Sequence, residues 1–141
     1  MKSPAVPWRT RLDLPARALV SALWIVAALF KLADPATFAR DIENYRILPA
    51  LVAAGLAVYL PWFELVLGAG LWVPRLRQAS RALSLALLVG FSLALLSALV
   101  RGLDINCGCF GAAGPDASAS WALARNLVLT ALLAISRSKA R

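Results

Sequence analysis

Four long apolar blocks constrain the fold of this chain more than any other feature of its sequence. In a chain of 141 residues they run approximately over residues 14–32, 48–73, 82–100 and 117–135. Each block can cross about 30 Å of hydrocarbon as a helix that rises about 1.5 Å per residue. The apolar fraction of 61% also exceeds the roughly 45–50% that is typical of soluble domains. The sequence therefore predicts a single integral membrane domain, an all-α bundle of four transmembrane helices.

The first block also has features of a secretory signal, because the basic residues Arg9, Arg11 and Arg17 lie before it and at its start. No convincing small-x-small cleavage site precedes Lys31, and three further apolar blocks follow. We therefore interpret the first block as a retained helix rather than a cleaved leader.

Lysine and arginine are unevenly divided between the two sides that four alternating helices define. One side carries ten basic residues and one acid, whereas the other carries five basic and five acidic residues. The basic set is Lys2, Arg9, Arg11, Arg17, Arg75, Arg77, Arg81, Arg137, Lys139 and Arg141, and its acid is Asp13. Because cytoplasmic loops carry the excess of Lys and Arg, both termini are predicted to be cytoplasmic. The two other loops would then face outwards from a bacterial inner membrane. The first of them contains an amphipathic segment, Thr37 to Leu48, which we expect to lie along the membrane surface.

Composition argues against several classes of function. The net charge of +8 does not indicate nucleic-acid binding, because the basic residues lie in short clusters between apolar blocks. The chain has no histidine, and its one methionine is Met1. A histidine general base, the usual haem ligands and the commonest zinc ligand are therefore missing. Two cysteines in one loop leave thiol chemistry as the main reactive resource.

The two cysteines, Cys107 and Cys109, are separated by one glycine in the second outer loop. A disulfide between them would close a small, strained ring, and strain makes a disulfide easier to exchange. Gly108 gives the backbone the torsional freedom that such a ring needs. This spacing favours an exchangeable redox couple. Two alternatives stay open: a soft-metal site for an ion such as Cu(I), completed by a second chain or a small ligand, and a pair of inert surface thiols.

Glu64 lies near the middle of the second apolar block. A carboxylate there costs roughly 2.5–3.5 kcal/mol unless it is protonated or paired, so we expect it to face the bundle interior. It is either a proton acceptor coupled to thiol or quinone redox or one member of a structural ion pair. Arg125, in the first third of the fourth block, is the expected partner unless it snorkels to the surface. Arg125 and Arg101 could also favour a thiolate at the cysteines.

Aromatic residues at bilayer depth leave quinone binding open. The set is Trp24, Tyr59, Trp62, Phe63 and Phe91. Ordinary packing is one explanation, and a quinone pocket between the second and third transmembrane helices is the other. DsbB and the vitamin K epoxide reductase-like proteins have such pockets, but they resemble this chain in helix number only and carry an additional cysteine pair.

Several short strings together resemble a known family. They are Phe30-Lys31-Leu32-x-Asp34, Tyr45-x-x-Leu48-Pro49, Leu60-Pro61-x-x-Glu64-x-x-Leu67-Gly68, Arg101-Gly102-x-x-Ile105-x-Cys107-Gly108-Cys109-Phe110-Gly111 and Arg125-Asn126. In this order and spacing, over about residues 14–136, the chain resembles the methylamine-utilisation MauE and DoxX-like redox-associated membrane proteins. The Cys-Gly-Cys-Phe-Gly string is the most specific part of this resemblance.

The resemblance implies a four-helix membrane protein that takes part in thiol–disulfide exchange outside the cytoplasm, beside a thioredoxin-like partner, during maturation of exported proteins. MauE itself is linked to formation of the disulfide-rich small subunit of methylamine dehydrogenase, although nothing in this chain identifies that client. The expected functional residues are Cys107, Cys109, Glu64 and Arg125. The rival interpretations are a metal-binding or small-molecule-binding membrane protein and a non-catalytic assembly subunit.

Overall fold

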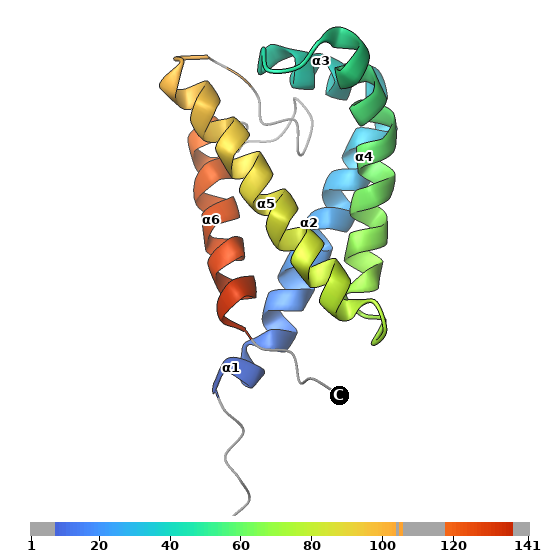
Figure 1. The fold of residues 1–141 in the computed structure, drawn as a ribbon, viewed down its shortest axis with the longest axis vertical. Helices are drawn as coiled ribbons and strands as arrows, with labels where there is room; N and C mark the ends of the chain where they lie inside the picture. Colours follow the sequence, from blue (N-terminus) through green and yellow to red (C-terminus); the bar gives the residue numbers. More distant parts are fainter. Residues whose placement is uncertain (1–7, 104, 106–117, 137–141) are drawn as a thin grey trace, which may run out of the picture.

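The computed structural model describes residues 8–103, 105 and 118–136. Within those residues all regular structure is helical (Figure 1). The helices are α1 (Trp8–Arg11), α2 (Asp13–Ala33), α3 (Pro35–Asn44), α4 (Ala50–Gly70), α5 (Arg77–Val100) and α6 (Ala119–Ile135). The prediction of an all-α fold is confirmed.

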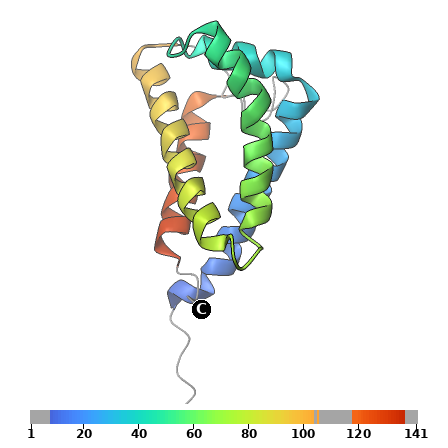
Figure 2. The same ribbon diagram turned by 45° about the vertical axis from the view of Figure 1, so that its right-hand side comes forward.

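Four of these helices, α2, α4, α5 and α6, lie lengthwise side by side, and α3 crosses one end of them (Figures 1 and 2). Helix α2 packs mainly on α4, and α5 packs mainly on α6. The turn between α4 and α5 lies at the end opposite α3, together with α1 and the end of α6. Successive long helices therefore alternate in direction, which places α3 and the residues flanking the cysteine loop at one end.

Three helices in the described part of the chain are long and apolar enough to cross a membrane: α2, α4 and α5. Helix α6 is apolar but has 17 residues, so it is only about 25 Å long at 1.5 Å per residue. Large apolar side chains such as Leu51 and Leu93 are exposed on the outside of the bundle. A continuous apolar exterior of this kind fits lipid as the surrounding solvent.

Local sequence signals explain where the helices begin and end. Asp34 caps α3, since its carboxylate accepts hydrogen bonds from the backbone N–H of Thr37 at 3.0 Å and from the Thr37 hydroxyl at 2.6 Å. These bonds hold the pKa of Asp34 below its ordinary value. Helix α5 ends at Val100, and the φ of 65° at Gly102 just beyond it lets the Leu103 N–H donate back to the Ala98 carbonyl at 3.0 Å.

Hydroxyl and indole groups join the helices inside the bundle. Ser21 of α2 donates to the Gly68 carbonyl of α4 at 2.8 Å, and the Trp72 indole donates to Ser21 at 3.0 Å. The Trp24 indole of α2 donates to the Ser84 hydroxyl of α5, also at 3.0 Å. Small residues at these contacts let the backbones approach closely, which is how helices associate in lipid.

The close approach at Gly68 yields the first prediction. A Cβ there would lie 2.9 Å from Ile25 Cγ1 and 3.3 Å from the Ser21 carbonyl oxygen. Gly68→Ala should therefore lower the free energy of unfolding by about 1–3 kcal/mol through overpacking. A Cβ added at Gly55 of the same helix would meet nothing within 4 Å, so Gly55→Ala should stabilise by about 0.5–1 kcal/mol. Unfolding of the purified protein by sodium dodecyl sulfate measures both changes, and equal effects would contradict the packing argument.

An arginine cluster holds the helices together at the end opposite α3. Arg81 of α5 donates to Asp13 at 3.1 Å and also to the carbonyl groups of Leu133 and Ser136 at the end of α6. Arg17 forms a second ion pair with Asp13 at 3.0 Å. The one acid counted on the basic side is thus neutralised by two arginines, and α2, α5 and α6 are joined there.

Candidate functional site

A buried ion pair lies between α2 and α4. The Lys31 ammonium contacts Glu64 Oε1 at 2.5 Å, and the exposed fractions of the two side chains are 2% and 0%. The expectation that Glu64 faces the bundle interior is therefore confirmed. Removing two charges from water is costly, and a close contact with a hydrogen bond is what compensates for it. The pair lies in the half of the bundle nearer α3, because Lys31 is in the last turn of α2.

Two phenyl rings complete the surroundings of Lys31. Its Nζ atom lies 4.8 Å from the centroid of the Phe38 ring and 5.2 Å from that of Phe91. Both distances fall within the range in which a ring face attracts a cation. Phe91 also packs against Trp24, with ring centroids 6.3 Å apart. Lys31 is therefore held by an acid and by aromatic side chains from α3 and α5.

The sequence predicted Arg125 as the partner of Glu64, whereas in the structure Lys31 contacts Glu64. Lys31 is the last basic residue of the first apolar block, so it was counted with the charges of the outer face. Arg125 lies in α6, where it donates to the side chain of Asn126 at 3.4 Å, and Asn126 is itself buried. The Phe-Lys-Leu string was a signal for Lys31, but its pairing with Glu64 depends on how α2 and α4 lie against each other.

A pocket of about 200 Å³ lies beside this ion pair, under α3 and between α4 and α5. Its lining is almost entirely apolar and aromatic, with two ionisable exceptions, Lys31 and Asp41. The other lining residues are Phe38, Ile42, Tyr45, Ile47, Leu48, Leu56, Phe91 and Ala94. The sequence predicted an amphipathic segment at this position lying along the membrane surface. Helix α3 turns Phe38 and Asp41 towards the bundle, and its place at the membrane surface stays a prediction.

Asp41 is the second buried acid near the pocket. Its exposed fraction is 9%. Within residues 8–103, 105 and 118–136, no group forms a hydrogen bond with its carboxyl oxygens. Burial raises the pKa of Asp41, an effect that the nearby Arg40 charge opposes. A buried carboxyl group facing an apolar pocket can hold a proton at a pH where an exposed aspartate is ionised. Nothing in the sequence pattern distinguished Asp41 from the other acids of this loop.

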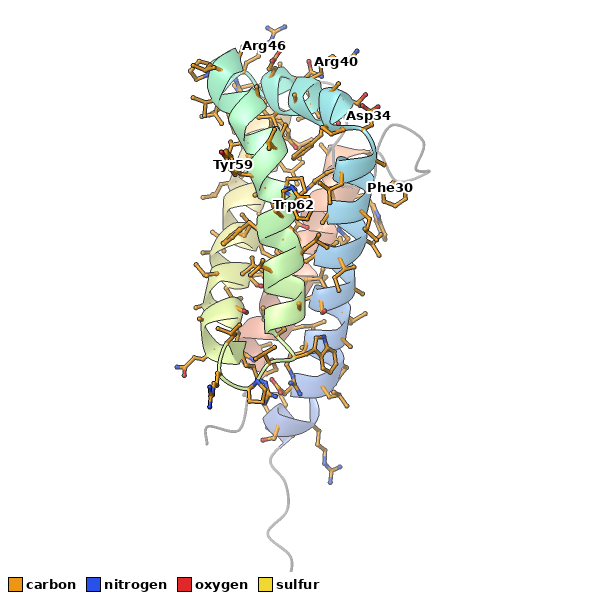
Figure 3. All side chains as sticks on the ribbon, turned by 90° about the vertical axis from the view of Figure 1, so that its right-hand side faces the viewer. Phe30, Asp34, Arg40, Arg46, Tyr59 and Trp62 are labelled. Carbon is orange, nitrogen blue, oxygen red and sulfur yellow. The ribbon has the colours of Figure 1, made fainter. Side chains whose placement is uncertain are left out.

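The aromatic residues considered for a quinone pocket are not brought together. Trp24 and Phe91 pack against each other inside the bundle. Tyr59, Trp62 and Phe63 are exposed on α4, where Figure 3 labels Tyr59 and Trp62. The pocket beside Lys31 is lined by only one residue of that set, Phe91.

The two cysteines lie outside the described residues, but the residues that flank their loop are described. Ile105 and Ala119 are both buried against Leu95 and Ala98 of α5, with Tyr45 packed beside them. Arg101, at the end of α5, donates to the carbonyl groups of Ser97 and Tyr45. The chain therefore enters and leaves the cysteine loop at the α3 end of the bundle. Effects of Arg101 or Arg125 on a thiolate stay a prediction.

The fold and its exterior define a multi-pass α-helical membrane protein with a buried acid–lysine pair. A family model described as "Methylamine utilisation protein MauE" matches residues 9–137. The chain belongs to this MauE family. The MauE part of the sequence resemblance is thus confirmed, and the DoxX part stays a prediction.

Relatives named "Methylamine utilization protein MauE" are similar to this chain over much of its length. The chain is 37% identical to that of Paracoccus versutus over 134 residues, which are 94% of this chain and 68% of the relative. It is 39% identical to that of Paracoccus denitrificans over 131 residues, which are 92% of this chain and 67% of the relative. The protein of Methylophilus methylotrophus is 36% identical over 95 residues, 67% of this chain and 50% of the relative. No solved structure matches the chain.

Proposed function

We propose that this protein is a membrane thiol–disulfide redox protein of methylamine utilisation. In this proposal Cys107 and Cys109 exchange disulfides with a thioredoxin-like partner outside the cytoplasm during maturation of exported proteins. The observation that carries it is the Cys-Gly-Cys pair in the loop between α5 and α6. Membership of the MauE family supports the assignment to methylamine utilisation.

The proposed orientation follows from the distribution of charge over the two ends of the bundle. The end with the α4–α5 turn carries the basic cluster of Arg11, Arg17, Arg75, Arg77 and Arg81. The end with α3 carries acids and bases in balance. By the excess of basic residues, the first end is cytoplasmic. All four long helices then cross the inner membrane, and the cysteine loop and α3 face the periplasm.

The exchange itself needs only two thiols and a partner disulfide. A thiolate of the pair attacks one sulfur of the partner disulfide, and a mixed disulfide forms while the other partner sulfur leaves as a thiolate. The second cysteine then attacks the mixed bond, which leaves the pair oxidised and the partner reduced. The same steps in reverse let an oxidised pair form a disulfide in the partner. In both directions two electrons pass between the proteins.

Location and redox state can be tested together in intact cells. We expect a bulky, membrane-impermeant maleimide to label Cys107 or Cys109 after mild reduction, because the charge distribution places their loop outside. Acid quenching and alkylation in membranes should show the pair as a disulfide before reduction and as two thiols after it. A variant with both cysteines changed to serine is the control for specificity. Labelling that requires permeabilised inner membrane would overturn the orientation, and thiols that never oxidise would overturn the redox role.

A further inference from the structure

The pocket beside Lys31 has an opening towards the surroundings of the bundle. Ile47, Leu48 and Leu56 line the pocket and are also exposed, so they form its rim. Helices α4 and α5 are joined by a short turn at one end and diverge towards α3 (Figures 1 and 2). In a membrane an apolar rim at this position faces lipid, so a molecule dissolved in the bilayer can enter between α4 and α5.

The walls of the pocket suit a flat ring. Aromatic side chains come from Phe38 of α3, from Tyr45 directly after that helix, and from Phe91 of α5. Aromatic rings pair well with other rings in offset or edge-to-face arrangements. The volume of about 200 Å³ corresponds to roughly seven water molecules at about 30 Å³ each. This space holds one substituted ring but not a phospholipid, whose chains would have to stay outside.

The charges around the pocket select the polar part of the ligand. Lys31 lines the pocket with its ammonium group, which disfavours a cation there and still has protons to donate beside the one that faces Glu64. An anion would lie against Asp41 as well as Glu64. A neutral oxygen that accepts a hydrogen bond from Lys31, and exchanges one with Asp41, avoids both penalties.

We infer that this pocket binds the ring of a membrane quinone or its hydroquinone, with an oxygen of the ring facing Lys31 and Asp41 and the isoprenoid tail leaving between α4 and α5. The inference rests on the proposed function where it names the oxidant of the cysteine pair. In that step two thiols each lose one proton and one electron, and a sulfur–sulfur bond forms. Both quinone carbonyl oxygens gain a proton and an electron and become hydroxyl groups.

Binding can be measured directly with ubiquinone-1 and the full-length protein in phospholipid nanodiscs. Ala94 lines the pocket from α5, whereas its neighbour Leu93 is exposed on the outside of the same helix. Filling the pocket with Ala94→Phe should raise the Kd for ubiquinone-1 at least tenfold. The matched control, Leu93→Phe, adds a ring facing lipid and should change the Kd less than twofold.

Further variants keep the test decisive. If Ala94→Phe does not fold by circular dichroism, Ile42→Trp blocks the same pocket from α3 and should weaken binding in the same way. Equal uptake by wild type and all variants would mean partition into lipid and would overturn the inference, as would the absence of saturable binding. A phospholipid retained in the pocket in native mass spectra, and not displaced by ubiquinone-1, would overturn it too. The Cys107→Ser/Cys109→Ser variant should bind ubiquinone-1 as the wild type does. A failure of quinone binding can therefore be distinguished from a failure of the proposed redox role of the cysteines.

Discussion

Cys107→Ser and Cys109→Ser should each abolish the proposed thiol–disulfide function, and one of them should accumulate a covalent mixed disulfide with a thioredoxin-like protein. The reason is that one thiolate attacks the partner and the other resolves the intermediate. Without the resolving cysteine the mixed disulfide persists, whereas without the attacking cysteine it never forms. The measurements are growth on methylamine, and non-reducing gel electrophoresis with mass spectrometry of the trapped partner after acid quenching.

The control for these variants is Ala112→Ser, which adds a hydroxyl group to the same loop and removes no thiol. It should grow and exchange disulfides as the wild type does.

A soft-metal site would give a different pattern. Both cysteine variants would lose bound metal, no partner would be trapped, and chelation of metal from the wild type would have the same effect as the substitutions. Normal growth of both single variants and the double variant would contradict either chemistry and favour an assembly subunit.

The sequence predicted the long helices well because lipid imposes a simple rule on them. The predicted span over 14–32 corresponds to α2 at Asp13–Ala33, and that over 82–100 corresponds to α5, which begins earlier at Arg77. The early start of α5 was missed because its first turn is polar. The length of a continuous apolar block is a property of the sequence alone, so the spans can be predicted without knowing how the helices pack.

The arrangement around Lys31 could not be predicted from the sequence. Lys31 of α2 contacts side chains of α3, α4 and α5 at once, and each contact depends on a helix rotation and register that apolar blocks do not encode. An amphipathic segment has no pattern that separates a lipid-facing side from a side facing the bundle, so the position of Phe38 and Asp41 of α3 against the bundle could not be predicted. The Asp41 carboxyl group and the pocket below it follow from that placement, so both were missed.

Breaking the Lys31–Glu64 pair on one side should destabilise the protein strongly. Lys31→Met removes the ammonium group that contacts the buried Glu64 carboxylate, so we expect the free energy of unfolding to fall by about 3–5 kcal/mol. Arg40→Met is the matched control, since Arg40 is exposed on α3 and its removal should change stability by less than about 0.5 kcal/mol. Reversible unfolding of the purified protein by sodium dodecyl sulfate in mixed micelles gives these values.

The double variant Lys31→Met/Glu64→Leu should recover most of that loss, because no charge is then buried alone and two apolar side chains of similar size replace the pair. A matching cycle of Arg125→Leu with Glu64→Leu should give a smaller coupling energy, since Lys31 contacts Glu64 at 2.5 Å. A larger coupling to Arg125 would contradict the pairing.

If the double variant is stable but cannot support growth on methylamine, the pair acts in the reaction, for which a proton carried by Glu64 is the simplest role. If it is stable and grows normally, the pair is structural and the proton-carrier role of Glu64 is wrong.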